Sequence, residues 1–444
     1  MSDAIEGSRP NIVLITLCTF RYTHMGAGGY NRPTTPFLDS LAGGGVFFEN
    51  AVSASSWTKP SVASILTGLT PNVHGMTDMS GDREIIGGQY SPKRVLAEEI
   101  VTLAECLRDA GYATAARVNN VQAGDFFQMT QGFDDAVTSH RMDTAAMLSD
   151  LAGWLARIDR GKPFFFFLLT RDAHIPYDPK YEYFQRFNRS PKAISQDEYA
   201  RYARHLNEEA RNTVEAGKPA SQELRRRWID LYDAELAQLD DALKRIPAIL
   251  DETGRATNTV IVVIADHGER FFEHGRIGHA MFLDEPVIHV PLILHGPNIP
   301  AGRRIKNVVR SIDLYPTLAA LAGGKPPDVL QGCNLLPLVL GDSAGFEPLT
   351  AFASFQGVEH VVRDGPYKFN HKPNGRRELF DLRRDPLELR DVAADQPDVA
   401  QRLEQRLAQW LHEEERLRQV VAEAPTRELT PEVIEQLRAL GYVR

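Results

Sequence analysis

The stretch that decides the fold is residues 55–68, SSWTKPSVASILTG. Pro60 suits the first turn of a helix, apolar residues then recur at helical spacing, and Gly68 favours the helix end. The sequence therefore predicts a short buried helix that begins just after Thr58. The free amides and positive dipole end of such a helix attract an oxyanion, which would lie beside the Thr58 hydroxyl. Taken alone, the residues are more typical of a simple capping threonine before a core helix.

Three apolar runs elsewhere predict buried parallel strands, at Ile12–Leu17, Phe164–Leu169 and Thr259–Ala265. In open α/β sheets, binding sites collect at the carboxyl ends of the strands. Cys18 follows the first of these runs, and Asp266 with His267 follows the last. An adjacent carboxylate and imidazole at a strand end offer one oxygen and one nitrogen ligand to a metal ion.

Length and composition set the broad class. With 444 residues and 43% hydrophobic residues, one large α/β domain with a smaller appendage is expected. The net charge of −9, without a long basic cluster, argues against nucleic acid or an anionic membrane as the main partner. No apolar run approaches the roughly 20 residues that cross a bilayer. The three cysteines have no metal-binding or redox spacing, so a reducing, cytoplasmic location is expected.

Several motifs in a fixed order carry a family resemblance. They are TKPS followed by ILTG within residues 58–68, PNIVLI at 10–15, TTPFLD at 34–39, GVFFENA at 45–51, PNVHG at 71–75, ADHGE at 265–269 with GH at 278–279, DLYPT at 313–317, and ELFDL at 378–382 with DP at 385–386. The chain thereby resembles the sulfatase family of the alkaline phosphatase superfamily over nearly its whole length. The resemblance implies an α/β fold with a mixed, mostly parallel sheet flanked by helices, and a C-terminal α+β subdomain.

The same resemblance makes Thr58 the nucleophile, with Lys59 beside it as a substrate contact. Sulfatases carry cysteine or serine at this position, which is oxidised to formylglycine within a Cys/Ser-x-Pro-x-Arg pattern. This chain has threonine there and Val62 at the arginine position, so no formylglycine is expected. Relatives with an unmodified threonine nucleophile resemble phosphonate monoester hydrolases and phosphodiesterases, in which an alkoxide attacks phosphorus and water then opens the ester.

The family also implies one divalent metal ion, held by Asp266, His267, Thr58 and residue 18. Relatives usually place aspartate at position 18, and this chain has Cys18. Without the family context, Cys18 is an ordinary buried hydrophobe. As a thiolate it could bind zinc, whereas it suits magnesium, calcium or manganese poorly. Thr23 also stands where many relatives have an acidic residue, so the identity of the metal stays open.

The remaining site residues come from two further strand ends and one loop. By resemblance, His174 and His279 handle the substrate oxyanion and the leaving group, while Asn120 and Asp172 contact the substrate. His279 could act as a general acid. An Asn119-Asn120 pair is also common in plain turns. A second metal would use Asp172, His174 and His279, but one metal is the simpler interpretation.

The predicted organisation is a polar N-terminal tail at residues 1–8, a catalytic domain at 9–345 with a helical insertion at 178–220, and a C-terminal subdomain at 346–444 with a small antiparallel sheet and helices. The predicted function is metal-dependent hydrolysis of a phosphate, phosphonate or sulfate ester of a small anionic molecule. Two alternatives remain: a non-catalytic anion-binding protein, suggested by Cys18, and a sulfuric ester hydrolase. The sequence leaves open whether the chain forms a homo-oligomer.

Overall fold

The computed structural model describes residues 9–79, 85–86, 89–190, 193–342 and 346–440. The tail predicted at residues 1–8 lies outside the described residues. At the centre is an eight-stranded sheet in the order β13-β2-β12-β9-β1-β8-β6-β7, in which only β12 runs antiparallel to its neighbours. Its strands are β1 (Asn11–Leu17), β2 (Val46–Val52), β6 (Ala113–Val118), β7 (Asp135–Thr138), β8 (Phe164–Thr170), β9 (Thr259–Ala265), β12 (His289–His295) and β13 (Arg303–Arg310).

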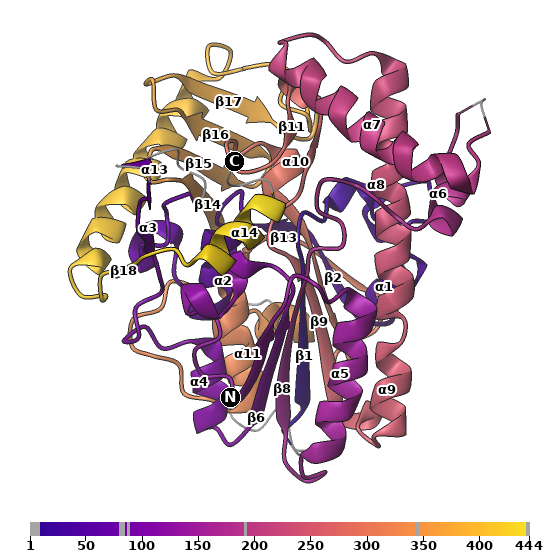
Figure 1. Cartoon of the computed structure of the whole chain (residues 1–444). Helices are drawn as coiled ribbons and strands as arrows, with labels where there is room; N and C mark the ends of the chain where they lie inside the picture. Colours follow the sequence, from indigo (N-terminus) through magenta and orange to yellow (C-terminus); the bar gives the residue numbers. More distant parts are fainter. Residues whose placement is uncertain (1–8, 80–84, 87–88, 191–192, 343–345, 441–444) are drawn as a thin grey trace.

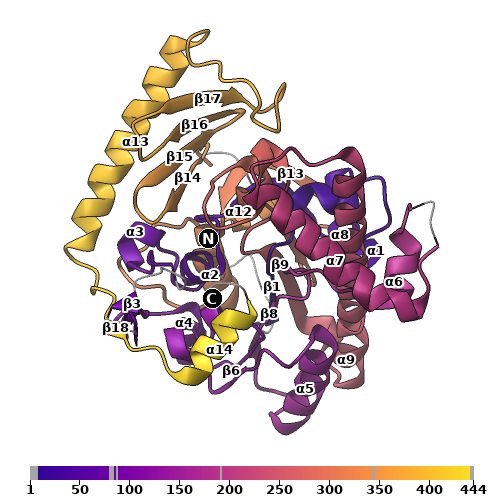
Figure 2. The same ribbon diagram turned by 45° about the horizontal axis from the view of Figure 1, so that its top comes forward.

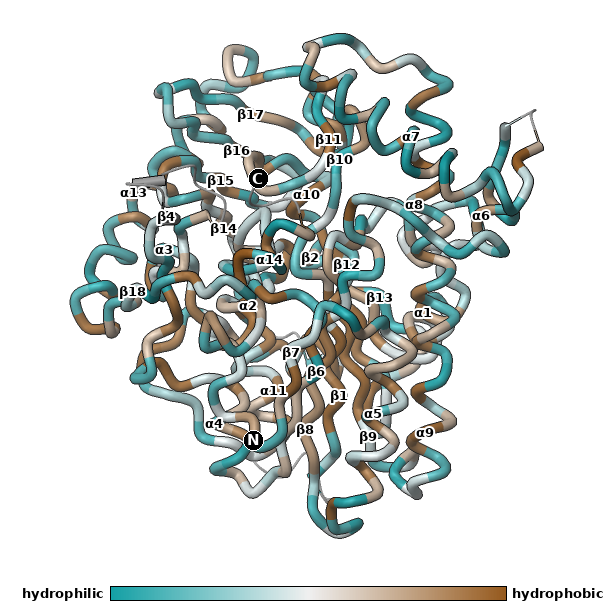
Figure 3. Tube along the Cα trace, in the orientation of Figure 1, coloured by the Kyte–Doolittle hydropathy of each residue, from teal (hydrophilic) through white to brown (hydrophobic). Residues whose placement is uncertain are grey.

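The middle of this sheet is the core of the molecule. Every residue of β1, β8 and β9 is buried, and their register places Leu14 opposite both Phe167 and Val262. Figure 3 shows the same strands as a brown, hydrophobic centre beneath largely teal outer helices. Continuous apolar runs belong in strands that are covered on both faces, so these three strands confirm the predicted mixed, mostly parallel α/β sheet.

Helices cover both faces of the sheet (Figure 1). On one face, α1 (Pro36–Gly44), α5 (Thr144–Arg157), α8 (Gln222–Leu243) and α9 (Ile246–Glu252) pack together, and on the other lie α2 (Thr58–Thr67), α4 (Leu103–Asp109) and α11 (Leu314–Ala322). The chain turns after Leu243, so that α8 and α9 are separate helices. The predicted insertion at 178–220 forms α6 (Tyr181–Phe187) and α7 (Gln196–Glu215), which flank α8.

The chain after residue 346 forms a second, smaller sheet. Its four antiparallel strands are β14 (Thr350–Phe355), β15 (Glu359–Asp364), β16 (Tyr367–His371) and β17 (Arg377–Asp381), and α13 (Pro397–Arg418) packs on it. Figure 2 shows this sheet above α2, with the helices α7 and α8 to the right of α2. The predicted antiparallel sheet is therefore present beside the carboxyl ends of the main strands.

The last segment returns to the main domain, which the sequence did not predict. Thr426 pairs with Arg94, and α14 (Pro431–Ala439) packs its apolar side chains, including Leu437, on Val121. Val121 follows directly after Asn120, at the end of β6. The C-terminal helix thus lies close to the strand ends at which the site was predicted (Figure 1).

Candidate active site

The helix predicted to begin just after Thr58 is α2 (Thr58–Thr67), which starts one residue earlier, and all of its residues are buried. Gly68 ends it in the left-handed conformation, with φ of 67°, as expected for a glycine in this position. The capping interpretation of Thr58 is wrong: Trp57 occupies the N-cap, and Thr58 is the first helical residue. The reason is that the Thr58 hydroxyl contacts side chains from other strand ends rather than the amides of α2.

Thr58 lies at the meeting point of three strand ends. Its Oγ1 is 3.3 Å from the Sγ of Cys18, 3.3 Å from the Nδ2 of Asn120 and 3.5 Å from the Nε2 of His267. These partners follow β1, β6 and β9, and all four side chains are fully buried. The parallel strands therefore bring together residues that are far apart in the sequence, at the sheet edge where the sequence predicted a site.

Three of these residues could hold a metal ion. One ligand atom from each of Cys18, Asp266 and His267 lies within 4.8 Å of the other two. The Nδ1 of His267 donates to the Gly268 carbonyl at 2.9 Å, which leaves its Nε2 as the acceptor that faces Thr58 and Asp266. The Oδ2 of Asp266 is buried without a hydrogen-bond partner among the described residues.

This donor set fits a borderline or soft divalent metal. One sulfur, one oxygen and one nitrogen match the ligands that zinc accepts in proteins. Without a cation, burial and the Asp266 carboxylate raise the pKa of Cys18 well above its usual value. Burial likewise raises the pKa of Asp266. A bound cation would reverse both effects, because it favours the charged forms of its ligands.

Two further histidines line the same space. The ring centre of His279 is 4.4 Å from that of His267 and 4.9 Å from that of His174. The Nδ1 of His174 donates to the Ile175 carbonyl at 2.5 Å, which fixes its tautomer. Burial lowers the pKa of His174 and of His279 to about 3. Both are therefore neutral in the protein without ligands.

Glu269 is the site residue that sequence reasoning missed. Its side chain is fully buried, and both carboxylate oxygens lie 3.4 Å from the Nδ1 of His279. Burial raises its pKa well above the usual value. The signal was present in the sequence, because Glu269 follows Asp266 and His267 by only a few residues, but a glutamate in a loop is ordinarily exposed.

The other predicted residues are held by neighbours. Asp172 accepts from the Asn119 side chain at 3.1 Å and from the Thr144 amide at 3.0 Å. The Nζ of Lys59 pairs with Asp78 at 2.6 Å and lies 5.0 Å from the centre of the Phe127 ring. The structure therefore does not place Asp172 or Lys59 in contact with the Thr58 hydroxyl, and their substrate-contact roles stay predictions.

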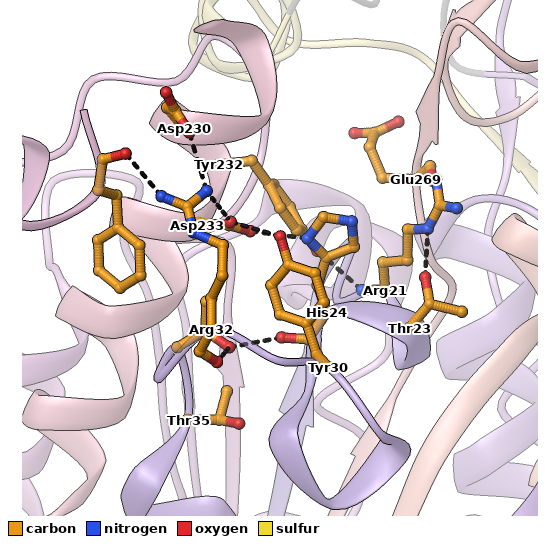
Figure 4. Close-up of polar contacts among 12 residues, drawn as sticks. Arg21, Thr23, His24, Tyr30, Arg32, Thr35, Asp230, Tyr232, Asp233 and Glu269 are labelled. Atoms are coloured by element: carbon orange, nitrogen blue, oxygen red, sulfur yellow. Dashed lines mark hydrogen bonds and ion pairs between the residues drawn. The ribbon is translucent and has the colours of Figure 1, made fainter. Parts of the chain in front are cut away.

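Thr23 and His274 also lie away from Thr58. The Oγ1 of Thr23 accepts from the Nε of Arg21 at 2.7 Å, as Figure 4 shows. The Nη1 of Arg21 also donates to the Glu269 carbonyl and pairs with the Glu273 carboxylate. His274 is exposed on the loop between β10 (Arg270–Phe271) and β11 (Ile277–Gly278). The residues at these two positions therefore belong to the surroundings of the site.

Comparison with known proteins agrees with this architecture. The sulfatase family model matches residues 10–324, and the model of the N-sulphoglucosamine sulphohydrolase C-terminal region matches residues 273–416. Arylsulfatase K of Xenopus laevis is 25% identical over 452 residues, which cover 92% of this chain and 83% of that protein.

Two solved structures share the fold over almost the whole chain. A protein solved in complex with its substrate D-glucosamine-2-N,6-O-disulfate has a TM-score of 0.77 at 20% identity, covering 92% of this chain and 98% of that one. The phosphonate monoester hydrolase of Agrobacterium radiobacter has a TM-score of 0.71 at 21% identity, covering 95% and 100%. The family match extends over more than half of the residues, and the protein therefore belongs to the sulfatase family of ester hydrolases, with the alkaline phosphatase-like fold.

Proposed function

We propose that the protein is a metal-dependent hydrolase in which the unmodified Thr58 hydroxyl attacks a phosphate, phosphonate or sulfate ester of a small molecule. The observation that carries this proposal is the position of Thr58 Oγ1, within 3.5 Å of Cys18, Asn120 and His267 at the start of a buried helix. A hydroxyl in that place is next to a candidate metal triad and to a helix terminus that attracts anions.

The residue type favours phosphorus esters. Threonine cannot form the aldehyde that sulfatases with cysteine or serine use, so the hydroxyl itself must act. In the first step the Oγ1 of Thr58 passes its proton to solvent water and bonds to phosphorus, while the bond from phosphorus to the alcohol oxygen breaks and that oxygen takes a proton from His279. In the second step water attacks the same phosphorus and frees Thr58. A bound divalent metal would lower the pKa of the Thr58 hydroxyl and offset the negative charge of the ester.

The side chains around Thr58 have separate tasks in this scheme. The Asn120 amide, already 3.3 Å from Oγ1, donates to the oxyanion. His279 gives a proton to the departing alcohol oxygen, and Glu269 orients its ring from the Nδ1 side. The negative charge of a bound ester raises the pKa of His279 from its ligand-free value, so protonation accompanies substrate binding.

Binding without catalysis is the second candidate, and Cys18 is the observation that favours it. Burial raises the pKa of the Cys18 thiol. A protonated thiol is a weaker ligand than aspartate for magnesium or calcium. A protein that had lost its metal would keep the anion-attracting start of α2 without activating Thr58. The ligand role of Cys18 also needs a reduced thiol, which suits the cytoplasmic location expected from the sequence; Cys18, Cys106 and Cys333 are all free.

The test combines elemental analysis with mass spectrometry. Protein purified without added metal is assayed for bound metal and for turnover of bis(4-nitrophenyl) phosphate, 4-nitrophenyl phenylphosphonate and 4-nitrophenyl sulfate. The expected result is one metal per chain, turnover of a phosphorus ester, and a peptide with an unmodified Thr58 that gains a phosphoryl or phosphonyl group during turnover. A protein that holds no metal and shows no turnover would support the binding-only candidate. An aldehyde at residue 58 would contradict the proposed nucleophile.

A further inference from the structure

A separate cavity, of about 450 Å³, lies at the amino ends of the central strands, at the opposite end of the sheet from Thr58. Residues that begin or precede parallel strands line it: Asn11 for β1, Gly111 for β6, Pro163 for β8 and Asn258 for β9. A strand of the length of β1 spans roughly 20 Å, and Cys18 follows its other end. The cavity therefore adjoins the same strands as the candidate active site but shares no residue with it.

The lining of this cavity carries positive charge without any carboxylate to balance it. Its charged side chains are those of Arg9, Arg160, Lys162 and Arg255. None of these cations has an ion-pair partner in the part of the chain that the structure describes. The whole chain has a net charge of −9, so composition alone does not explain a local excess of unpaired positive charge. A ligand of this cavity would have to supply the missing negative charge.

Arg255 forms the buried wall of the cavity and is only 3% exposed. Its Nη1 donates to the Arg160 carbonyl at 3.3 Å, and its Nη2 donates to the carbonyls of Ile158 and Asp159 at 3.2 and 3.1 Å. Its Nε has no hydrogen-bond partner among the described residues. Burial and the charge of Arg160 lower the pKa of Arg255, while the Asp159 carboxylate acts in the opposite direction. Neutral carbonyls thus fix this guanidinium without cancelling its charge, and a nearby oxyanion would stabilise the charged form.

The exposed cations around Arg255 keep donors free for a ligand. The side-chain nitrogens of Arg160 and Lys162 make no hydrogen bond within the described residues. The Nη1 of Arg9 donates to the Ala110 carbonyl, which holds this guanidinium at the cavity wall. Guanidinium and ammonium groups only donate hydrogen bonds, so the partner that they lack is an acceptor.

The size and the lining indicate which anion fits. Sites for small molecules measure roughly 300 to 1,000 Å³, and this cavity lies within that range. The negative net charge of the chain disfavours a nucleic acid as the ligand. No aromatic side chain is among the described residues that line the cavity, so a nucleotide base would find nothing on which to stack. Arginine and lysine side chains that converge on one point are suited to phosphate groups.

We propose that this cavity binds a diphosphate group, either free or at the end of a nucleotide whose base stays outside. The phosphate oxygens accept from Arg160, Lys162 and Arg9, and the buried charge of Arg255 faces them from behind. This inference is independent of the proposed hydrolysis, because the cavity is at the other end of the sheet. It therefore stands or falls by binding experiments alone.

Labelling of lysines tests this cavity separately from the candidate active site. Lys162 is exposed, so an amine-reactive reagent modifies it, and peptide mass spectrometry measures the rate. Inorganic diphosphate is expected to slow the modification of Lys162 several-fold. Lys218, an exposed lysine after α7, is the control and should react at an unchanged rate. Unchanged labelling of Lys162 at saturating diphosphate would overturn the proposal.

Calorimetry then measures affinity in a matched pair of variants. Arg160→Ala combined with Lys162→Ala should weaken diphosphate binding at least about tenfold, because two of the phosphate contacts are lost. Arg211→Ala combined with Lys218→Ala removes two exposed cations elsewhere and should leave the affinity unchanged. Thermal unfolding checks that both proteins are folded. An equal loss in both variants, or in neither, would contradict a site at this cavity.

A series of anions distinguishes the possible sources of the diphosphate group. Inorganic diphosphate, adenosine diphosphate, orthophosphate and sulfate are compared by their protection of Lys162. Similar protection by the first two is expected, since recognition rests on the phosphates, and tighter binding of adenosine diphosphate would identify a nucleotide as the source. Equal protection by sulfate at the same concentration would overturn the diphosphate assignment, because it would show a general anion site only.

Discussion

Two clusters of buried polar side chains lie close together after β1, and they differ in how completely they are paired. In the first, around Asp233 of α8, every contact is short (Figure 4). The two carboxylate oxygens of Asp233 lie 2.7 Å from His24 Nδ1, 2.6 Å from the Tyr30 hydroxyl and 2.5 Å from Arg32. Arg32 also pairs with Asp230 at 2.8 Å.

In the second cluster, around Thr58, the contacts are longer and incomplete. Oγ1 of Thr58 lies 3.3 to 3.5 Å from its three neighbours, and Oδ2 of Asp266 has no hydrogen-bond partner among the described residues. Tyr232 links the two clusters, since its hydroxyl donates to the Thr19 carbonyl at 2.9 Å and the Thr19 amide donates to Asp266 at 3.2 Å.

The difference separates structural from functional burial of polar groups. A buried polar group is normally satisfied, so an exception calls for an explanation. The Asp233 cluster is satisfied within the protein and fixes the chain after β1 against α8. The Thr58 cluster leaves Oδ2 of Asp266 without a hydrogen-bond partner among the described residues, which is the behaviour expected of a reaction centre. Substitutions in the two clusters should therefore have opposite signatures.

The largest expected effect is on activity. Thr58→Ala should lower kcat by at least about 10³-fold, because the atom that forms the new bond is removed, while the melting temperature stays near that of wild type. Steady-state assays of a phosphorus ester and thermal unfolding measure the two quantities. Thr67→Ala is the matched control at the far end of α2, where the hydroxyl donates to the Ala63 carbonyl and accepts from the Leu69 amide, and it should keep turnover. A folded Thr58→Ala protein with normal turnover would refute the nucleophile.

His279→Ala should distinguish substrates by their leaving groups. A general acid matters most when the departing oxygen is basic, so the loss should be about 10² to 10⁴ for alkyl esters and much smaller for nitrophenyl esters. The measurement is kcat/KM across a series of leaving groups. His205→Ala, an exposed histidine on α7, should leave the series unchanged. Equal losses along the series would make His279 a metal ligand or a structural residue.

The Asp233 cluster should respond in stability. Asp233→Ala leaves the buried His24 and the half-buried Tyr30 and Arg32 without their shared acceptor, which should cost about 3 kcal/mol or more of unfolding free energy. Denaturant unfolding measures this loss, and turnover per folded molecule should change little. Asp241→Ala is the control on the same helix, because Asp241 is exposed and accepts one hydrogen bond from Tyr183. If turnover fell while stability stayed constant, the assignment of the two clusters would have to be reversed.

Much of the fold follows from local sequence, and the exceptions have a physical reason. The run Thr259–Ala265 predicts β9 to the residue, because a strand buried on both faces must be continuously apolar. The packing of α14 on Val121 was not predictable, since its apolar side chains show that a partner exists without showing which one. Long-range returns of this kind depend on tertiary contacts that no local pattern encodes.

The candidate site likewise contains residues that the sequence predicted and residues that it did not. Strand-end position and family resemblance together placed Cys18, Thr58, Asp266 and His267 in one cluster, and the structure brings them together. The sequence did not predict that Glu269 is buried in the site, nor which neighbours hold Lys59 and Asp172. Residue type predicts which groups can do chemistry, whereas their partners depend on where each loop folds back.

The smallest expected effect is that of Cys18→Asp. It tests the comparison of the two clusters most directly, because it changes the metal ligands of the Thr58 cluster. Cys18→Asp should tighten binding of magnesium, manganese or calcium relative to zinc by on the order of tenfold, about 1.4 kcal/mol, and should raise activity with the hard metals. Calorimetric titration with each metal, alongside phosphodiester assays, measures both, and Cys333→Ser is a control at a cysteine outside the triad.

The sign of the result decides how this site differs from its relatives. Without metal the introduced carboxylate would face Asp266 directly, so the metal-free variant should melt at a lower temperature than wild type and gain more on adding magnesium. If wild type instead holds zinc tightly and the substitution abolishes binding, the thiolate is an adapted ligand in a rebuilt site. If neither protein binds metal, the centre has lost its cation, and anion binding alone becomes the better account of Thr58 and α2.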